Sequence, residues 1–263
     1  EMVAIGYLVY DITGSPFLLG LVEAGFAIPT LVLALFGGAM ADRLDRKRVI
    51  QVGQGIAVLV AVSLAVIILT GNIKWGHLMV AALIEGALFA FLMPARQSFI
   101  PQLVKPEQFT NAMGINSAAF SSMTLVAPAV AGGLYAFMGP GAVYVVVTSL
   151  YVGSLMLTTQ VRRVKAAPVE ERRSVVGDIK EGLAYVLGNR TIMTVLAIGF
   201  LGSMLSWPFR MLLPIFVVDV YDLGPDAMGL MISVLGAGSL VGSLTIASLG
   251  RWRRGLLLIL GTF

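Results

Sequence analysis

The sequence predicts an all-α membrane protein whose helices cross the bilayer several times. Of its 263 residues, 12% are charged and 58% are hydrophobic, whereas soluble domains carry about 25% charged and about 45–50% apolar residues. Apolar runs recur along the whole chain, and several exceed the roughly 18 residues that indicate a spanning helix. The runs are almost continuously apolar and lack the alternation of a barrel strand, so we expect helices.

Residues 1–161 are expected to form the N-terminal half of a helical bundle. The apolar run at 2–10 is expected to be the tail of a spanning helix that begins before Glu1. A helix rises about 1.5 Å per residue and the hydrocarbon core is about 30 Å thick, so about 20 apolar residues cross it. Complete spans are expected at 17–41, 49–70, 77–95, 113–138 and 142–161.

Residues 162–190 are the only long loop of the predicted topology, and they are mixed in charge. A helix with one apolar and one polar face favours the boundary between headgroups and acyl chains. We therefore expect a cytoplasmic linker whose amphipathic helix lies along the membrane surface. The apolar residues that recur on one face are Val176, Ile179, Leu183 and Val186.

Residues 191–263 are expected to form the start of a C-terminal half. A segment that begins at Val9, VYDITGSPFLLGL, is similar to VYDLGPDAMGL, which begins at Val220. Each copy leads into a glycine-rich span, and equal orientation of the copies predicts two parallel pseudo-repeat halves. Chance similarity between apolar segments is the alternative. The expected spans are 191–218, 227–249 and the start of another from Gly255.

The distribution of charge predicts the orientation. Lys and Arg gather in alternate loops, and such loops face the cytoplasm. The opposite loops hold acidic residues and one cation, Lys74. The net charge of +4 therefore reflects loops beside a lipid bilayer, and no nucleic-acid partner is expected. The basic residues are Arg43, Arg46, Lys47, Arg48, Arg96, Lys105, a cluster from Arg162 to Arg190, Arg251, Arg253 and Arg254, and the acidic ones are Asp11, Asp219, Asp222 and Asp226.

The loop after the 17–41 span contains the motif GGAMADRLDRKRV, which begins at Gly37. It resembles the signature of the major facilitator superfamily between the second and third helices, Gly-x-x-x-Asp-Arg-x-Gly-Arg-[Arg/Lys]. One position departs, with Asp45 in place of glycine. The alternative is an ordinary cluster of cytoplasmic cations. The matching residues are Gly38, Asp42, Arg43, Arg46 and Lys47.

This resemblance implies a twelve-helix major facilitator fold, of which the chain would run from the end of helix 1 to the start of helix 9. The signature loop would then govern gating, the exchange between conformations, rather than contact cargo. We expect Gly38 to permit close helix approach. Asp42, at a helix end, is expected to pair with a basic side chain or with the N-terminus of an adjoining helix.

A second motif lies on the 113–138 span. It is similar to the antiporter motif of the same superfamily, in which spaced glycines lead to Gly-Pro-x-x-Gly-Gly, although other residues replace three of the glycines. The resemblance implies exchange of cargo against protons, and helix packing alone is the alternative. The matching residues are Gly114, Pro128 and Gly132, and the replacements are Met123, Ala127 and Ala131.

Two further segments narrow the resemblance. PARQSFIPQLV from Pro94 and GDIKEGLAYV from Gly177 are similar to the branch that contains enterobactin exporters and macrolide efflux proteins. This branch implies a small amphipathic cargo of the drug, macrolide or siderophore type. It also implies a multi-pass protein of the bacterial inner membrane.

Two carboxylates inside the predicted spans are candidate proton sites. A charge at the bilayer centre costs about 2.5–3.5 kcal/mol on insertion scales, so retained charges are functional candidates. Glu85 lies eight residues into its span, roughly 12 Å along the helix axis and near the middle of the core. The family fold places helices 1, 4 and 7 around a central cavity, which favours Glu85. The alternative for Glu85 is a carboxylate that a neighbouring serine or basic group satisfies. Glu23 lies closer to the outer surface.

The 191–218 span contains a candidate cargo-binding face. Arg210 follows Ser203 and Trp207 at offsets that place all three on one side of a helix. The arginine would pair with a carboxylate or an anionic cargo, and the indole would stack on an aromatic one. Snorkelling of Arg210 to the outer interface is the alternative. Asn116, on the 113–138 span, is a further candidate for the polar wall of the cavity, and hydrogen bonding between helices is the alternative.

The remaining composition favours a transporter over an enzyme. The chain has no cysteine and a single histidine, His77, so neither a metal site nor a cofactor is expected. A Walker motif is absent, and no clustered nucleophile and base suggests catalysis. We therefore predict a secondary active transporter whose partners are a small-molecule cargo, protons and lipid. The alternative is a receptor or scaffold that uses the same fold without transport.

Overall fold

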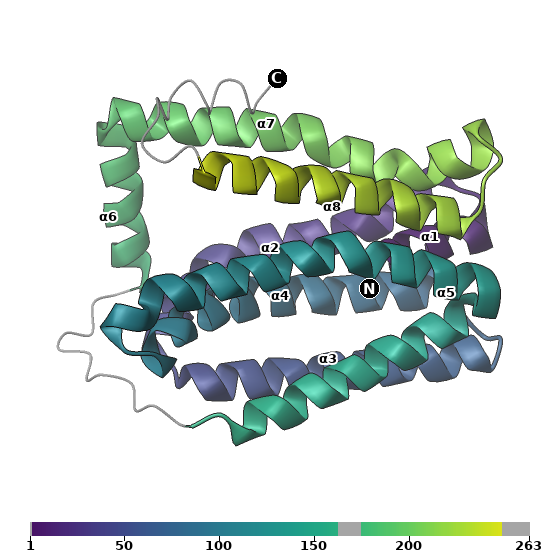
Figure 1. Ribbon diagram of the computed structural model, residues 1–263, viewed down its shortest axis with the longest axis horizontal. Coiled ribbons are helices and arrows are strands. Elements are labelled where there is room, and N and C mark those ends of the chain that lie inside the picture. Colours follow the sequence, from purple (N-terminus) through teal and green to yellow (C-terminus); the bar gives the residue numbers. More distant parts are fainter. Residues whose placement is uncertain (1, 163–174, 249–263) are drawn as a thin grey trace.

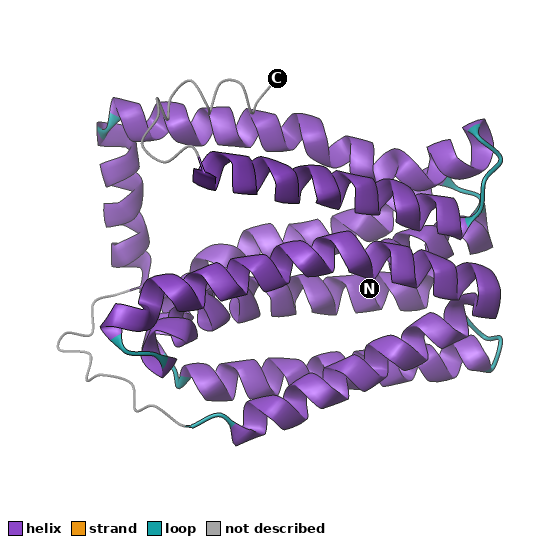
Figure 2. Cartoon of the chain, viewed as in Figure 1, coloured by secondary structure: helices purple, strands orange, loops and turns teal. Residues whose placement is uncertain are grey.

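The computed structural model describes residues 2–162 and 175–248. Within these ranges the chain consists of helices joined by loops, with no strand (Figure 2). The all-α prediction is therefore confirmed for this part of the chain. The helices are α1 (Met2–Thr13), α2 (Pro16–Arg43), α3 (Arg46–Leu69), α4 (Trp75–Leu103), the 3-10 turn η1 (Pro106–Gln108), α5 (Phe109–Gln160), α6 (Val175–Gly188), α7 (Arg190–Ile215), the π-helical turn η2 (Phe216–Val220) and α8 (Pro225–Ser248).

Helices of membrane-spanning length and apolarity are present among the described residues. They begin and end close to the runs predicted from the sequence. A shorter apolar stretch, Arg190–Gly202, forms the first part of α7. The predicted span from Gly255 lies outside the described residues. The stretches that meet both criteria are Pro16–Ala34, Arg46–Leu69, Trp75–Leu103 and Pro106–Gln160.

Helix α5 is a hairpin of two antiparallel segments (Figure 1). The break is at Gly139, whose φ of 77° and ψ of 176° are not helical. Glycine adopts such positive φ values without steric cost, and Pro140, which follows, has no amide hydrogen to donate. The first segment (109–138) and the second segment (140–160) therefore correspond to the two separate spans predicted from the sequence.

The helices share one long axis, so the molecule has two ends (Figure 1). At the end that we call the basic end, Lys47 of α3 donates to the carbonyl oxygen of Thr159 at 2.8 Å, which joins the start of α3 to the end of α5. The opposite, acidic end holds Asp11 in α1 and Asp219 in η2. Basic and acidic loops of the described chain thus lie at opposite ends, whereas Arg251 lies outside the described residues.

The linker helix α6 is transverse to the spanning helices and crosses the basic end next to the start of α7 (Figure 1). Its position along the membrane surface stays a prediction. Most side chains of its predicted apolar face lie outside the described part of the chain. The boundaries of a separate linker domain therefore stay a prediction.

Helices α2 and α4 pack with their backbones in contact. A Cβ atom on Gly86 would lie 2.2 Å from the carbonyl oxygen of Phe26. A Cβ atom on Gly37 would lie 2.0 Å from the carbonyl oxygen of Ala90. The hydroxyl of Thr30 donates to the carbonyl of Gly86 at 3.0 Å. Small residues of this kind let helices approach closely in a membrane, where lipid is as apolar as the side chains.

A close approach of the kind expected at Gly38 is seen at the adjacent Gly37, which faces α4 directly. Among the described residues, no atom of a neighbouring element lies within 4 Å of the Cβ position of Gly38. Successive residues of a helix point about 100° apart. Of two adjacent glycines, one can face the neighbouring helix while the other faces elsewhere.

The first segment of α5 packs equally closely against α8. A Cβ atom on Gly132 would lie 3.0 Å from the Cα atom of Gly229. One on Gly229 would lie 2.5 Å from the carbonyl oxygen of Pro128, and one on Gly236 would lie 2.7 Å from that of Thr124. We call this contact the α5–α8 seam. It joins the helices before the linker to those after it.

The main cluster of buried apolar side chains connects the same two groups of helices near the acidic end. Leu8 and Val9 of α1 are 1% and 0% exposed. They belong to one cluster with Leu213 of α7, Val217 of η2 and Met228 of α8. The helices before and after the linker are therefore packed together at this end of the bundle.

Several helix ends differ from the hydropathy prediction. The fourth span was expected to end at residue 95, but α4 continues to Leu103 through Pro94 and Pro101. The seventh was expected to continue to residue 218, but α7 ends at Ile215 and the chain passes into η2. Apolarity reports the thickness of the bilayer core, whereas the hydrogen bonds of a helix such as α4 continue into the polar boundary. For α7 the hydrogen-bond pattern changes within the apolar run, which apolarity does not report.

Candidate functional site

Glu85 lies in the middle of α4 and is 9% exposed. Its position follows from its neighbour Gly86, which brings α4 against the backbone of α2 at Phe26. The hydrogen bond from Thr30 to the carbonyl of Gly86 holds the same turn in register. Glu85 thus lies on a helix, as the sequence predicted, and its side chain is buried. Its role as a proton site stays a prediction.

Glu23 shares a cavity with Glu85. A space of about 10 Å³ is lined by both carboxylate residues together with Ile5 of α1 and Phe26 of α2. That volume is close to the lower limit for one water molecule. The carboxylate oxygen of Glu23 would lie 3.1 Å from a Cβ atom on Gly6, so it rests against the backbone of α1. The structure therefore brings together two candidates that the sequence treated as separate.

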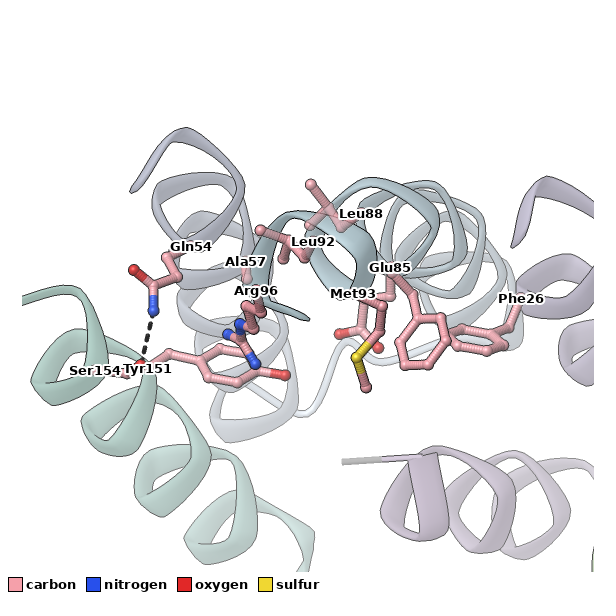
Figure 3. Close-up of a pocket in the computed structure, with 11 residues that line it drawn as sticks. Phe26, Gln54, Ala57, Glu85, Leu88, Leu92, Met93, Arg96, Tyr151 and Ser154 are labelled. Carbon is pink, nitrogen blue, oxygen red and sulfur yellow. Dashed lines mark hydrogen bonds between the residues drawn. The ribbon is translucent and has the colours of Figure 1, made fainter. Parts of the chain in front are cut away.

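A larger cavity of about 280 Å³ lies on the other side of Glu85 (Figure 3). Its walls come from α2, α3, α4 and the second segment of α5. Gln54 of α3, 6% exposed, donates to the hydroxyl of Ser154 at 2.8 Å across this cavity. Arg96, which is exposed, also lines the cavity. A single cavity thus extends from an exposed cation on α4 to the buried carboxyl group three turns away.

Two residues of the signature loop, Asp45 and Lys47, make defined contacts in the structure. Asp45 is the N-cap of α3 and accepts a hydrogen bond from the backbone N–H of Arg48 at 3.3 Å. Aspartate is a favoured N-cap residue, which explains why it stands where the signature has glycine. Lys47 is 6% exposed, and its ammonium group donates to the carbonyl oxygens of Thr159 and Val161 at 2.8 and 2.5 Å.

The rest of the signature is described only in part. Asp42 and Arg43 form the last residues of α2, but their side chains lie outside the described part of the chain. Arg46 is half-buried at the first position of α3. The pairing expected for Asp42 and the gating role of the loop stay predictions.

The antiporter-like motif divides between two environments. Pro128 and Gly132 are buried in the α5–α8 seam. Gly114 has no atom of a neighbouring element within 4 Å of its Cβ position among the described residues. Asn116, on the same helix, is exposed. Pro128 and Gly132 therefore face α8, which belongs to the predicted C-terminal half.

The acidic end contains contacts that the sequence did not predict. The phenol of Tyr10 in α1 donates a short hydrogen bond to the Oδ2 atom of Asp219 in η2. The phenol of Tyr135 in α5 donates to the Oδ2 atom of Asp11 at 2.8 Å. The rings of Tyr7 and Tyr135 pack edge to face, with centroids 4.9 Å apart. The repeated Val-Tyr-Asp segments were the signal that marked this region.

Other candidates are not placed at the site. Trp207 and Arg210 belong to α7, but their side chains, like that of Ser203, lie outside the described part. His77 accepts a hydrogen bond at Nδ1 from the backbone N–H of Lys74 at 3.2 Å and so completes the N-terminus of α4. Among the described residues there is no group of three or more potential metal ligands.

Comparisons with known proteins agree with this architecture. A profile of the family described as transmembrane secretion effector matches residues 1–260. Macrolide efflux protein A of Streptococcus pyogenes is 25% identical over 98% of this chain and 64% of its own length. The multidrug efflux pump Tap of Mycolicibacterium fortuitum is 26% identical over 95% of the chain and 63% of its own length. The Staphyloferrin A transporter of Staphylococcus aureus is 23% identical over 87% of the chain and 57% of its own length.

The chain thus spans about three fifths of the length of these relatives. The family match covers nearly the whole chain, and the spanning helices and the signature motif agree with it. The chain belongs to the transmembrane secretion effector family of the major facilitator superfamily.

Proposed function

We propose that this chain is part of a secondary active transporter that exports a small amphipathic molecule in exchange for protons. Family membership supports a transporter. Relatives named for macrolide and multidrug efflux support export, and the relative named for staphyloferrin A extends the range of cargo to a siderophore. The cargo of this protein therefore belongs to the drug, macrolide or siderophore type.

The observation that supports proton coupling most directly is the pair of acidic residues at one cavity. Glu85 and Glu23 line the same small space between α1, α2 and α4. Two carboxyl groups close together do not readily both ionise, so at least one takes up a proton. Protonation that differs between two conformations biases the equilibrium between them. In this proposal Glu85 carries the coupled proton. The nearby carboxyl group of Glu23 makes the charged form of Glu85 less favourable.

Alternating access supplies the movement in this mechanism. The helices up to α5 form one half and those from α7 onward form the other, with α6 in the linker between them. The α5–α8 seam lets the halves pivot along a close backbone contact, because a glycine-lined surface presents few side chains that would interlock. The signature loop at the basic end controls the exchange between conformations.

The charge distribution supports the orientation of the protein in the bacterial inner membrane. Lys47, Arg48, Lys105 and Arg190 lie in the loops or first helical turns at one end. By the positive-inside rule this basic end faces the cytoplasm. The acidic end then faces outward and is the side on which cargo leaves. Burial of the aromatic and apolar cluster at the acidic end corresponds to a state that is closed to the outside.

A flux measurement on the full-length protein tests this proposal. The protein is reconstituted in liposomes with an acidic lumen, and accumulation of a quaternary ammonium dye is followed. A quaternary cation has no titratable amine, so it is not trapped passively by the pH gradient. We expect accumulation that exceeds that of empty liposomes and disappears when a protonophore removes the gradient.

The alternative is a receptor or scaffold that uses the same fold without transport. Such a protein would bind the dye but give the same flux as empty liposomes. Flux that persists unchanged with the protonophore would support a transporter without proton coupling. Each result therefore separates one part of the proposal from the others.

A further inference from the structure

We propose that the hydrogen bond between Tyr10 and Asp219 is a clasp that holds the acidic end closed and must break for the transporter to open there. The inference rests on the proposed alternating-access function. It assigns a gating role to two residues that lie outside the signature and antiporter-like motifs. The hydroxyl of Tyr10 belongs to α1, before the linker, and Asp219 belongs to η2, after it.

The surroundings of Tyr10 fit such a role. Tyr10 is 5% exposed and belongs to the apolar cluster that includes Val217 of η2 and Leu213 of α7. Its ring therefore contributes to the closed contact, while its hydroxyl reaches the edge of the cluster. Asp219 is exposed, so its carboxylate regains water when the bond breaks. A buried donor with a solvated acceptor gives a bond that closes the gate without making it permanent.

The local backbone of η2 positions Asp219 toward α1. Residues Phe216–Val220 form a single π-helical turn at the end of α7. The backbone N–H of Tyr221 donates to the carbonyl of Phe216 at 3.0 Å, and that of Leu223 donates to the carbonyl of Val217 at 2.9 Å. A π turn widens the helix by one residue and changes the direction of the side chains that follow. Asp219 lies within this turn, next to the second copy of the repeated segment.

A second tyrosine–aspartate bond in the same region provides an internal comparison. Tyr135 donates to Asp11 at 2.8 Å, but both residues precede the linker, on α5 and α1. Movement of one half against the other leaves this bond intact. The two bonds have the same chemistry and lie at the same end of the molecule. They differ in whether they connect the two halves, which is the property that the proposal concerns.

The clasp predicts a defined change in the conformational equilibrium. Replacing Tyr10 with phenylalanine removes one oxygen atom and keeps the ring in the apolar cluster. A hydrogen bond to a charged group that is formed in only one state favours that state by about tenfold or more, and solvent at Asp219 reduces this gain. We therefore expect Tyr10→Phe to raise the ratio of open to closed molecules at the acidic end about five- to tenfold.

The experiment measures the distance between the halves in the full-length protein. Spin labels are attached at Phe17→Cys, at the start of α2, and Leu223→Cys, between η2 and α8. Both sites are exposed, at 75% and 44%, and the chain contains no natural cysteine. Distance distributions in nanodiscs are compared for the labelled parent, Tyr10→Phe and Tyr135→Phe. We expect the longer distance to gain population in Tyr10→Phe and to stay at the parent level in Tyr135→Phe.

Asp219→Asn keeps the shape of the acceptor and weakens the bond, so it should shift the distribution in the same direction by a smaller amount. It serves as a second test if Tyr10→Phe does not fold. Unchanged distributions in the folded variants would overturn the clasp, as would equal shifts in Tyr10→Phe and Tyr135→Phe. Dye flux by the labelled parent is measured in parallel. Normal flux with no shift contradicts the clasp alone, whereas absence of flux contradicts the proposed function.

Discussion

The side chain of Lys47 joins two helices at the basic end through backbone carbonyl groups. The last carbonyl groups of a helix have no partner within the helix and carry partial negative charge. The ammonium group of Lys47 satisfies those of Thr159 and Val161 at the end of α5. The lysine of the signature therefore stabilises the contact between α3 and the second segment of α5.

This arrangement predicts a loss of stability when Lys47 is replaced by methionine. The variant keeps most of the aliphatic stem but leaves the carbonyl groups of Thr159 and Val161 without this donor. Loss of hydrogen bonds to a charged group typically costs about 1.5–3 kcal/mol. We expect the free energy of unfolding of the full-length protein in detergent to fall by about this amount, as measured by denaturant titration.

The neighbouring cation Arg48 gives a matched control. Its charged contact in the described structure is an exposed pair with Asp45 at 3.5 Å, and such pairs contribute about 0–1 kcal/mol. Arg48→Met should therefore change stability by less than about 1 kcal/mol. Equal losses in Lys47→Met and Arg48→Met would mean that the buried contact of Lys47 has no special role.

At the residue scale, the sequence singled out both Glu85 and Glu23 as candidates but did not indicate that they line one cavity. Counting residues along an apolar run gives depth in the membrane, because a helix has a constant rise. It gives no information on which helices pack side by side. The cavity shared by Glu23 and Glu85 depends on the contact between α2 and α4, so it became visible only in three dimensions.

At the scale of elements, the α5–α8 seam is the most direct link between the predicted halves. Gly132 of the antiporter-like motif contacts α8 through backbone atoms. A Cβ atom there would lie 2.5 Å from the carbonyl oxygen of Pro225 and 3.0 Å from Gly229. Real carbon atoms do not approach so closely, so any side chain at this position separates the helices.

Gly132→Ala is therefore expected to destabilise the full-length protein. Overpacking of a close contact costs about 1–3 kcal/mol, against a gain of about 0.5–1 kcal/mol for alanine over glycine within a helix. The net loss should appear as a lower midpoint of thermal unfolding in detergent.

Gly133 provides the control for Gly132→Ala. It lies on the same helix, but within the described part of the chain no atom of a neighbouring element is within 4 Å of its Cβ position. Gly133→Ala should therefore show the gain in helix propensity without the clash, and its unfolding midpoint should equal or exceed that of the parent. If both variants unfold at the same temperature, the seam is looser than the structure indicates.

The paired glycines show what sequence patterns cannot resolve at this scale. The glycine of the signature corresponds to Gly38. Among the described residues, however, it is Gly37 that contacts α4. Both glycines satisfy a search for small residues at a helix interface. The rotation of α2 about its own axis decides between them, and that rotation follows from packing along the whole helix.

On the scale of the whole molecule, charge and hydropathy predicted the architecture well. The expected spans agree with the described helices because a helix is one of the two structures that satisfy all backbone groups in lipid. The break at Gly139 lies between the expected spans 113–138 and 142–161. The grouping of basic and acidic loops at opposite ends also agrees with the alternation of Lys and Arg along the chain.

The contacts between distant segments could not be predicted from the same patterns. Tyr10 and Asp219 are 209 positions apart, and the repeated Val-Tyr-Asp segments suggested similar environments without indicating that they meet. Helix pairing in a membrane depends on shape complementarity and on a few hydrogen bonds. Neither has a periodic signal in one sequence.

Proton movement coupled to cargo movement is the central claim, and it can be measured in one experiment. Liposomes that contain the full-length protein and a pH-sensitive dye in the lumen are given an inward gradient of cargo without a pH gradient. Because coupling is reciprocal, inward movement of cargo should drive protons out and make the lumen alkaline. Glu85→Gln should bind cargo and fail to change the pH of the lumen. Alkalinisation by Glu85→Gln at the rate of the parent protein would contradict the assignment of the coupled proton to Glu85.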